Sequence, residues 1–193
     1  MKLNKKRCFW LNQKNLDYVN YHDNEWGHPI FSDELHFENL TLEGAQAGLS
    51  WETVLKKRNN YRQFFYNFEI EKVSKMNSSR LEKILLDPGI IRNRLKIFSV
   101  VNNAKCMMTI QKEFGSFNDY IWQFSDNKII YANSKKSFED TNIFKQNLSK
   151  TISKDLKKRG FKFVGETIIY SYLQASGIFQ GHTKECFLFN KKL

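Results

Sequence analysis

Two short segments contain residue types that can bind a flat, positively charged ligand. Residues 21–27 read YHDNEWG, and residues 42–51 add Glu43 and Trp51. The face of an aromatic ring attracts a cation, and a carboxylate supplies the opposite charge. The combination of Tyr21, Trp26 and Trp51 with Glu43 therefore predicts a pocket for an electron-poor ring such as a nucleobase.

Glu43 is the residue that we single out for catalysis. Leu40 lies three positions before it and Ala47 four positions after it, so a helix would place all three on one largely apolar face. A carboxylate there is costly unless it meets a partner. The structural alternative is a buried glutamate satisfied by a backbone amide or an arginine. Gly44 and Gly48 permit close backbone approach, which favours the pocket.

The three aromatic residues of the expected pocket also have a simpler interpretation. Aromatic side chains at irregular spacing more often belong to a hydrophobic core. Tyr21, Trp26 and Trp51 nevertheless lie close in sequence to charged or polar residues that a dry core would avoid, including His22 and Glu43. We therefore retain the interpretation that they line a slot for a base.

Two cysteines and two histidines near the ends of the chain supply the ligand types of a closed tetrahedral zinc site. These residues are Cys8, His22, His182 and Cys186. The spacing alone does not decide whether the site forms, because the two pairs lie at opposite ends of the sequence. If the site forms, it joins the two termini. His28 and His36 are alternative ligands to His22, and we expect both at the surface.

The segment from Asp87 to Arg94 combines a Pro-Gly turn with basic residues. Exposed amides at the start of the following helix would bind a phosphate. The alternative is an ordinary turn between two helices with a solvated basic face. The run KKRGFKF at residues 157–163 poses the same choice, since its rings either accompany DNA contacts or anchor the segment.

The composition favours a basic protein with a polyanionic partner. Lys and Arg number 31 and Asp and Glu 20, giving a net charge of +11 in 193 residues. Three cysteines provide no compact disulfide framework, which favours a reduced, cytoplasmic protein. The basic start lacks the apolar run of a signal peptide, and no window approaches a membrane span.

The elements that position these residues are expected to be helices. Ser32 followed by Asp33 and Glu34 predicts a helix start, and this helix carries Leu42 and Glu43. Ser79 with Glu82 predicts a capping box for a second helix, which ends at residues 87–89. Three further helices are predicted. One has the apolar spacing Ile97, Val101, Ala104 and Met108 and ends at Gly115, and another has Leu148, Ile152 and Leu156 and ends at Gly160. The last is predicted over residues 167–176.

The only strand-like run, residues 128–131, is too short and isolated to build a sheet. Residues 125–142 are therefore predicted to form a surface excursion. We expect an all-α fold with two helical lobes and a groove between them.

Several ordered blocks make the chain resemble the DNA-3-methyladenine glycosylase I family of the helix-hairpin-helix glycosylase superfamily. They are Cys8, YHDNEWG at 21–27, LEG at 42–44, AGLSW at 47–51, GIIR at 89–92, KKRGFKFVG at 157–165, and the His182 to Cys186 spacing. The blocks extend nearly from end to end. His28 and Glu166 depart from the pattern that we associate with the family.

The resemblance implies a single helical glycosylase unit over residues 1–193. It implies a hairpin-containing lobe at about 33–124 and a terminal lobe built from about 1–32 and 125–193. It also implies one structural zinc ion on Cys8, His22, His182 and Cys186, and a base pocket of Tyr21, Trp26, Glu43 and Trp51. The implied DNA contacts come from Gly48, Leu49, Gly89, Ile90, Ile91, Arg92 and Arg94.

The reaction implied by the resemblance is hydrolysis of the N-glycosidic bond of N3-methyladenine in alkylated double-stranded DNA. It leaves an abasic site, and we expect a monomer. No lysine lies within the pocket motifs, so water is expected to attack the sugar rather than a lysine amine, which would form a Schiff base. Two alternatives remain at this stage. One is a zinc-stabilised module that binds DNA without cleaving it, and the other is a glycosylase for a different alkylated base.

Overall fold

The computed structural model describes residues 5–131 and 138–189, with the side chains of residues 138–141 excepted. The described part is helical and contains no β-strand. Ile130 and Phe179 form an isolated parallel bridge. The helices are α1 (Leu16–Asn24), α2 (Asp33–Gln46), α3 (Trp51–Phe64), α4 (Ile70–Ser74), α5 (Ser78–Leu86), α6 (Arg94–Phe114), α7 (Phe117–Trp122), α8 (Phe138–Lys158) and α9 (Glu166–Ala175), with short 3₁₀ turns η1 (Tyr66–Phe68) and η2 (Gln123–Ser125).

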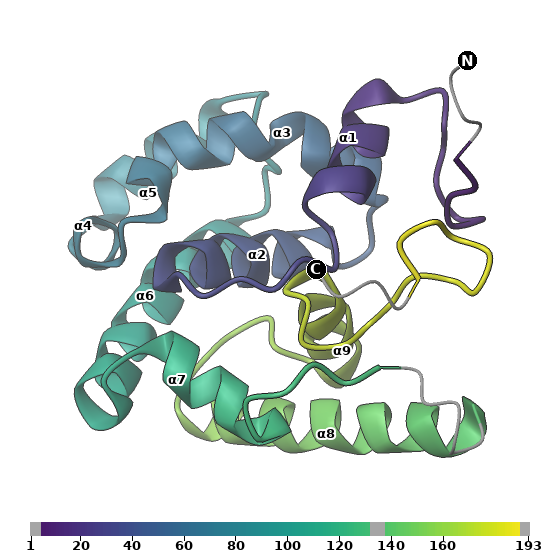
Figure 1. Cartoon of the computed structure of the whole chain (residues 1–193). Coiled ribbons are helices and arrows are strands. Elements are labelled where there is room, and N and C mark those ends of the chain that lie inside the picture. The colour runs from purple at the N-terminus through teal and green to yellow at the C-terminus, as the bar shows by residue number, and fades with distance from the viewer. Residues whose placement is uncertain (1–4, 132–137, 190–193) are drawn as a thin grey trace.

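Helix α2 lies in the middle of the molecule. It contacts α3, α6, α7 and α9, and most of its residues are buried. Figure 1 shows α2 between α3 on one side and α8 and α9 on the other. Because α2 carries Glu43, the central helix brings a carboxylate into the interior.

Local signals in the sequence explain several helix ends. Ser32 caps α2 by accepting a hydrogen bond from the amide of Leu35, as predicted. Gly115 ends α6 with a φ of 89°, and Gly160 follows α8 with a φ of 91°. This left-handed backbone is accessible to glycine at little cost. The predicted last helix corresponds to α9.

The predicted capping box at Ser79 is wrong. Helix α5 begins at Ser78, and its cap is Asn77, two residues before Ser79. The Asn77 side chain accepts a hydrogen bond from the amide of Arg80. An asparagine caps a helix as well as a serine does. The predicted apolar face holds, since Leu81 and Ile84 are buried.

Two other predictions about helix positions require correction. Ala47 does not share the apolar face of Glu43, because α2 ends at Gln46 and Ala47 is exposed. His36 is not at the surface but fully buried, where its Nδ1 lies 2.6 Å from the hydroxyl of Tyr172. A hydroxyl partner from a distant helix can satisfy a buried imidazole, and the local sequence cannot show this.

The region predicted as a surface excursion, residues 125–142, is only partly one. Residues 132–137 lie outside the described residues, and α8 already begins at Phe138. Ile130 is tied to the C-terminal segment, because its amide donates to Ile178 and its carbonyl accepts from Gln180. Among the described residues, no helix combines the length and apolar character needed to cross a membrane.

The two ends of the described chain lie side by side, as Figure 1 shows for the first purple and last yellow segments. The amide of Phe187 donates to the carbonyl of Lys6 at 2.9 Å. This pairing brings Cys8 close to the segment that carries His182 and Cys186.

Candidate functional site

A cavity of about 400 Å³ opens between the N-terminal segment, α1, α2, α3, α9 and the C-terminal segment. All four residues predicted for the base pocket line it, namely Tyr21, Trp26, Glu43 and Trp51. Its walls combine aromatic rings with polar side chains. The structure therefore brings together the pocket residues that the sequence had singled out.

Glu43 is buried within this lining, with 5% of its surface exposed. Burial raises the pKa of its carboxyl group to about 8, because desolvation penalises the charged form. No hydrogen bond or ion pair joins Glu43 to another residue in the described part of the chain. A buried carboxyl group without a protein partner is poised to respond to a ligand in the cavity.

The alternative for Glu43 is a buried carboxylate satisfied by a backbone amide or an arginine, and no such contact is present in the described part of the chain. Two arginines of α3 bind a different glutamate of α2. Arg58 donates to Glu38 at 2.5 Å and to Glu25 at 2.6 Å. Arg62 also donates to Glu38, at 2.8 Å. These arginines therefore bind carboxylates other than Glu43, which lines the cavity.

The aromatic residues of the cavity belong to different elements. Tyr21 on α1 and Trp51 at the start of α3 have ring centroids 5.2 Å apart, with 38° between the ring planes. The Ser50 side chain caps α3 by accepting a hydrogen bond from the amide of Thr53. This cap fixes the start of the helix, where Trp51 is the first residue. The tilted pair forms one wall of the cavity, and Trp26 contributes another.

Sequence analysis missed other residues that line the cavity. They are Phe9, Trp10, Tyr18, Gln46, Ser171, Gln174, Gly181 and Thr183. Tyr18 lies one helical turn before Tyr21, so the i, i+3 spacing on one helix face was an available signal. Ser171 and Gln174 have the same spacing on α9, but no local pattern indicated that α9 would reach this cavity.

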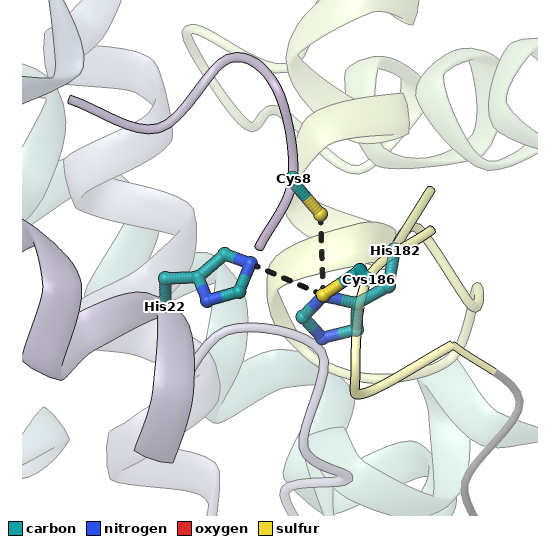
Figure 2. Close-up of side chains that lie close together, drawn as sticks. All are labelled: Cys8, His22, His182 and Cys186. Atoms are coloured by element: carbon teal, nitrogen blue, oxygen red, sulfur yellow. Dashed lines mark hydrogen bonds between the residues drawn. The ribbon is translucent and has the colours of Figure 1, made fainter. Parts of the chain in front are cut away.

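Beside the cavity, the four predicted metal ligands converge. The ligand atoms of Cys8, His22, His182 and Cys186 all lie within 4.8 Å of one another, and all four residues are buried. Figure 2 shows their side chains pointing toward a common centre.

The distances within this Cys/His cluster suit a metal ion. His182 Nδ1 lies 3.5 Å from the sulfur of Cys8 and 3.5 Å from that of Cys186. His22 Nε2 lies 3.6 Å from the sulfur of Cys186. Tetrahedral zinc with its usual bond lengths separates its ligand atoms by about 3.3 to 3.8 Å. The residues present can therefore bind a metal ion.

Neighbouring groups orient the ligands. Asp23 Oδ1 lies 2.8 Å from His22 Nδ1, and Arg7 holds the same carboxylate with hydrogen bonds of 2.8 to 3.1 Å. A carboxylate on the far nitrogen of a ligating histidine fixes the orientation of the ring. Burial lowers the pKa of His182 to about 4, which keeps its imidazole neutral and able to ligate.

The turn between α5 and α6, residues 87–93, is held firmly against α3. Lys57 Nζ donates to the carbonyl of Pro88 at 2.6 Å, and Asn60 donates to that of Gly89 at 3.0 Å. A Cβ on Gly89 would lie 2.1 Å from the Asn60 amide, so this contact requires glycine. The Gly89 amide is already bound by Asp87 at 2.6 Å.

The side chains of this turn have different environments. Ile90 and Ile91 are buried and anchor the turn, so only their backbone remains for a ligand. Arg94 is paired with Glu82 at 2.7 Å and lies over the ring of Phe98. Arg92 is exposed and makes no ion pair with any residue in the described ranges. It is therefore the arginine of this turn that is available to a phosphate.

The loop between α2 and α3 projects from the surface. Gly48 has a φ of 76°, with nothing within 4 Å of where a Cβ would be, and Leu49 is 41% exposed. Gly44 differs, because a Cβ there would lie 3.0 Å from the Cβ of Phe163. The close approach expected at Gly44 is thus between α2 and the segment that carries Phe163.

The basic run at residues 157–163 is largely tied into the protein. Arg159 binds Glu113 at 2.5 Å and Asp155 at 2.7 Å, and Phe161 is buried. These contacts favour the anchoring interpretation for Arg159 and Phe161. Lys157 and Lys158 remain exposed.

Comparison with known proteins gives a consistent result. A family model described as methyladenine glycosylase matches residues 10–189. The chain is 42% identical over 183 residues to the DNA-3-methyladenine glycosylase 1 of Escherichia coli, covering 94% of this chain and 95% of that protein. It is 41% identical over 180 residues to the DNA-3-methyladenine glycosylase of Haemophilus influenzae, covering 93% and 96%. A crystal structure of 3-methyladenine DNA glycosylase I superposes with a TM-score of 0.86 at 40% identity, covering 95% of this chain and all of that one.

Proposed function

Because the chain belongs to the methyladenine glycosylase family, we propose that it is a DNA repair enzyme that excises N3-methyladenine from alkylated DNA. It hydrolyses the N-glycosidic bond, releases the free base and leaves an abasic site. The names of the relatives from Escherichia coli and Haemophilus influenzae support this activity. The observation that carries it in this chain is the buried, unpartnered Glu43 in an aromatic cavity.

Charge supplies the selectivity in this proposal. Extruding a base from the duplex costs a few kcal/mol. A cationic ring on a desolvated aromatic surface gains about 2 kcal/mol. A carboxylate about 4 Å away adds roughly 4 kcal/mol at an effective dielectric of 20, before desolvation. Neutral adenine lacks both gains, so the cavity offsets base extrusion only for the alkylated base.

The raised pKa of Glu43 makes its charge dependent on the ligand. At neutral pH the empty cavity favours the protonated carboxyl group. A cationic base reverses this preference, since an opposite charge stabilises the ionised form. We assign Glu43 the role of binding and orienting the base. The rings of Tyr21, Trp26 and Trp51 stack on the base.

Water is the proposed nucleophile. Among the described residues that line the cavity there is no lysine, so none is placed to form a Schiff base with the sugar. An adenine alkylated at N3 carries a positive charge and is a good leaving group. The protein therefore needs mainly to hold the cation and admit water.

One zinc ion on Cys8, His22, His182 and Cys186 is the proposed structural cofactor. The converging thiols and imidazoles and the Asp23 contact to His22 support it. The ion would bind the N-terminal segment and α1 to the C-terminal segment. It takes no part in the reaction.

Double-stranded DNA is proposed to contact the turn at residues 87–93 and the loop between α2 and α3. Arg92 binds a phosphate, with Arg94 contributing beside Glu82. Gly89, Ile90 and Ile91 lie at the same contact, where the amides of Gly89 and Ile90 would exchange their hydrogen bonds to Asp87 for a phosphate. Gly48 and Leu49 enter the gap left by the extruded base. The exposure of Leu49 and the open space around Gly48 support this arrangement. The α5–α6 unit is the helix-hairpin-helix in this proposal.

Two helical lobes flank the cleft in this proposal, one from about 33–124 and one from about 1–32 with 125–193. The protein acts as a monomer in the cytoplasm. Its cysteines Cys8, Cys106 and Cys186 are free of disulfides, in keeping with a reducing compartment.

Release of free bases from alkylated duplex DNA, separated by chromatography, tests the function. The wild-type protein should release 3-methyladenine, and Glu43→Gln should lose most of this activity. Glu34→Gln, an exposed glutamate on the same helix, is the control. Full activity in Glu43→Gln would exclude charge recognition, and release of a different alkylated base would reassign the substrate. Binding without any release would favour a DNA-binding module.

A further inference from the structure

Lys96 is a buried cation that the proposed reaction does not use. It is 9% exposed, and burial lowers the pKa of its ammonium group. Its Nζ donates to the carbonyl of Ala45 at 2.9 Å and to that of Ala47 at 2.6 Å. It makes no ion pair within the described ranges, so carbonyl dipoles rather than a carboxylate stabilise the buried charge.

The position of these carbonyls explains the contact. They belong to the C-terminal end of α2, where the last carbonyls of a helix lack intrahelical partners and carry partial negative charge. The last turn of α2 contains no basic residue of its own. Lys96, from α6, supplies the missing cation and donors.

The two ends of this contact lie at functionally different places. Lys96 is the third residue of α6, the helix that directly follows the turn at residues 87–93. Ala45 lies two residues after Glu43, and Ala47 immediately precedes Gly48 and Leu49. One side chain therefore connects the turn proposed to bind the DNA backbone with the loop proposed to enter the duplex.

Little else fixes the loop between α2 and α3. Within the loop, the amide of Leu49 donates to the carbonyl of Gln46 at 2.7 Å. Gly48 makes no close contact, and the residues from Ala47 to Ser50 are exposed. The loop is thus held mainly from its first residue by Lys96 and from its last by the Ser50 cap of α3.

We propose that Lys96 is a positioning residue that couples DNA-backbone binding at the α5–α6 turn to placement of the Gly48–Leu49 loop in the gap left by an extruded base. This inference rests on the proposed function. Without the ammonium group, the Ala45 and Ala47 carbonyls would turn to water, and the loop would no longer be fixed relative to the turn. The cavity itself, formed by α1, α2, α3 and α9, would remain.

The test compares Lys96→Met with Lys105→Met, an exposed lysine on the same helix. Single-turnover release of 3-methyladenine from duplex DNA should fall about tenfold or more in Lys96→Met, the size expected for losing a charge-assisted hydrogen bond. Affinity for a duplex with a stable abasic-site analogue should fall toward that for undamaged duplex. Affinity for free 3-methyladenine, read by tryptophan fluorescence, should stay within about twofold, since that difference is under 0.5 kcal/mol. Lys105→Met should match the wild type in all three measurements.

Lys96→Arg is the second variant, because a guanidinium can still donate to both carbonyls. It should restore part of the lost excision and of the preference for the abasic duplex. Two results would overturn the proposal. One is unchanged excision and duplex preference in Lys96→Met, and the other is a parallel fall in excision, free-base affinity and melting temperature. Failure of the wild-type protein to release 3-methyladenine would instead refute the proposed function.

Discussion

Trp26 packs edge-on against His182, with 4.8 Å between the ring centroids and 87° between the ring planes. Trp26 lines the cavity, whereas His182 belongs to the Cys/His cluster. Trp10, which also lines the cavity, contacts His22 with 5.4 Å between centroids. Because the same rings surround the cluster and wall the cavity, the state of the cluster should affect the shape of the cavity.

Metal removal should therefore weaken base binding as well as stability. Purified protein should contain about one zinc per chain, and Cys186→Ser should lose the metal and much stability. The affinity of Cys186→Ser for free 3-methyladenine should also fall. Metal analysis, thermal unfolding and fluorescence titration provide the measurements. Cys106→Ser, outside the cluster, should change none of these three properties. A metal-free protein as stable as the metal-bound protein would contradict the zinc assignment.

Glu43 should make the stability of the protein depend on pH. Its folded pKa of about 8 lies above the ordinary value of 4.5, so the folded state retains a proton that the unfolded state loses. The contribution of the Glu43 carboxyl group to the free energy of unfolding is fully present below pH 4.5, and it is lost as the pH rises through 8. Denaturant unfolding should show Glu43→Gln gaining about 2 to 3 kcal/mol relative to wild type between pH 6 and 8. A constant difference across this range would show that the Glu43 pKa is not raised.

Arg92 and Arg94 should contribute unequally to DNA binding. Arg92 is exposed without an ion pair in the described part of the chain, whereas Arg94 must give up Glu82 and Phe98 to reach a phosphate. Arg92→Ala should weaken binding to any duplex and reduce the slope of log K against log salt by about 1. Arg94→Ala should have a smaller effect. Equal losses in salt-dependent binding measurements would argue against this distinction.

Arg58 should be important for stability. Arg58→Met would leave Glu38, which is 4% exposed, with only the partly exposed Arg62 as partner. Removing one partner of a buried ion pair lowers the free energy of unfolding by about 3 to 5 kcal/mol. Because Glu38 keeps its contact with Arg62, the decrease should lie near the lower limit. Denaturant unfolding measures this loss. Lys75→Met, which breaks a fully exposed pair with Glu71, should leave stability nearly unchanged and serves as the control.

Local chemistry in the sequence determined most of the helices and the residue types of the site. Ser32, Gly115 and Gly160 mark helix ends because caps and left-handed glycines act within a few residues. The thiols, imidazoles, carboxylate and rings that define the possible chemistry were equally readable. Helix α5 was predicted with the wrong cap because Asn77 and Ser79 are both acceptable capping residues.

Tertiary packing decided what those groups face, because contacts between distant segments depend on how helices pack and not on spacing along the chain. It brought Cys8 and His22 to His182 and Cys186, and it buried Glu43 without a hydrogen-bonding partner among the described residues. It buried His36 against Tyr172 and placed Ser171 and Gln174 in the cavity wall. It also brought Lys96 to the end of α2, a contact across 49 to 51 residues that no local pattern indicates.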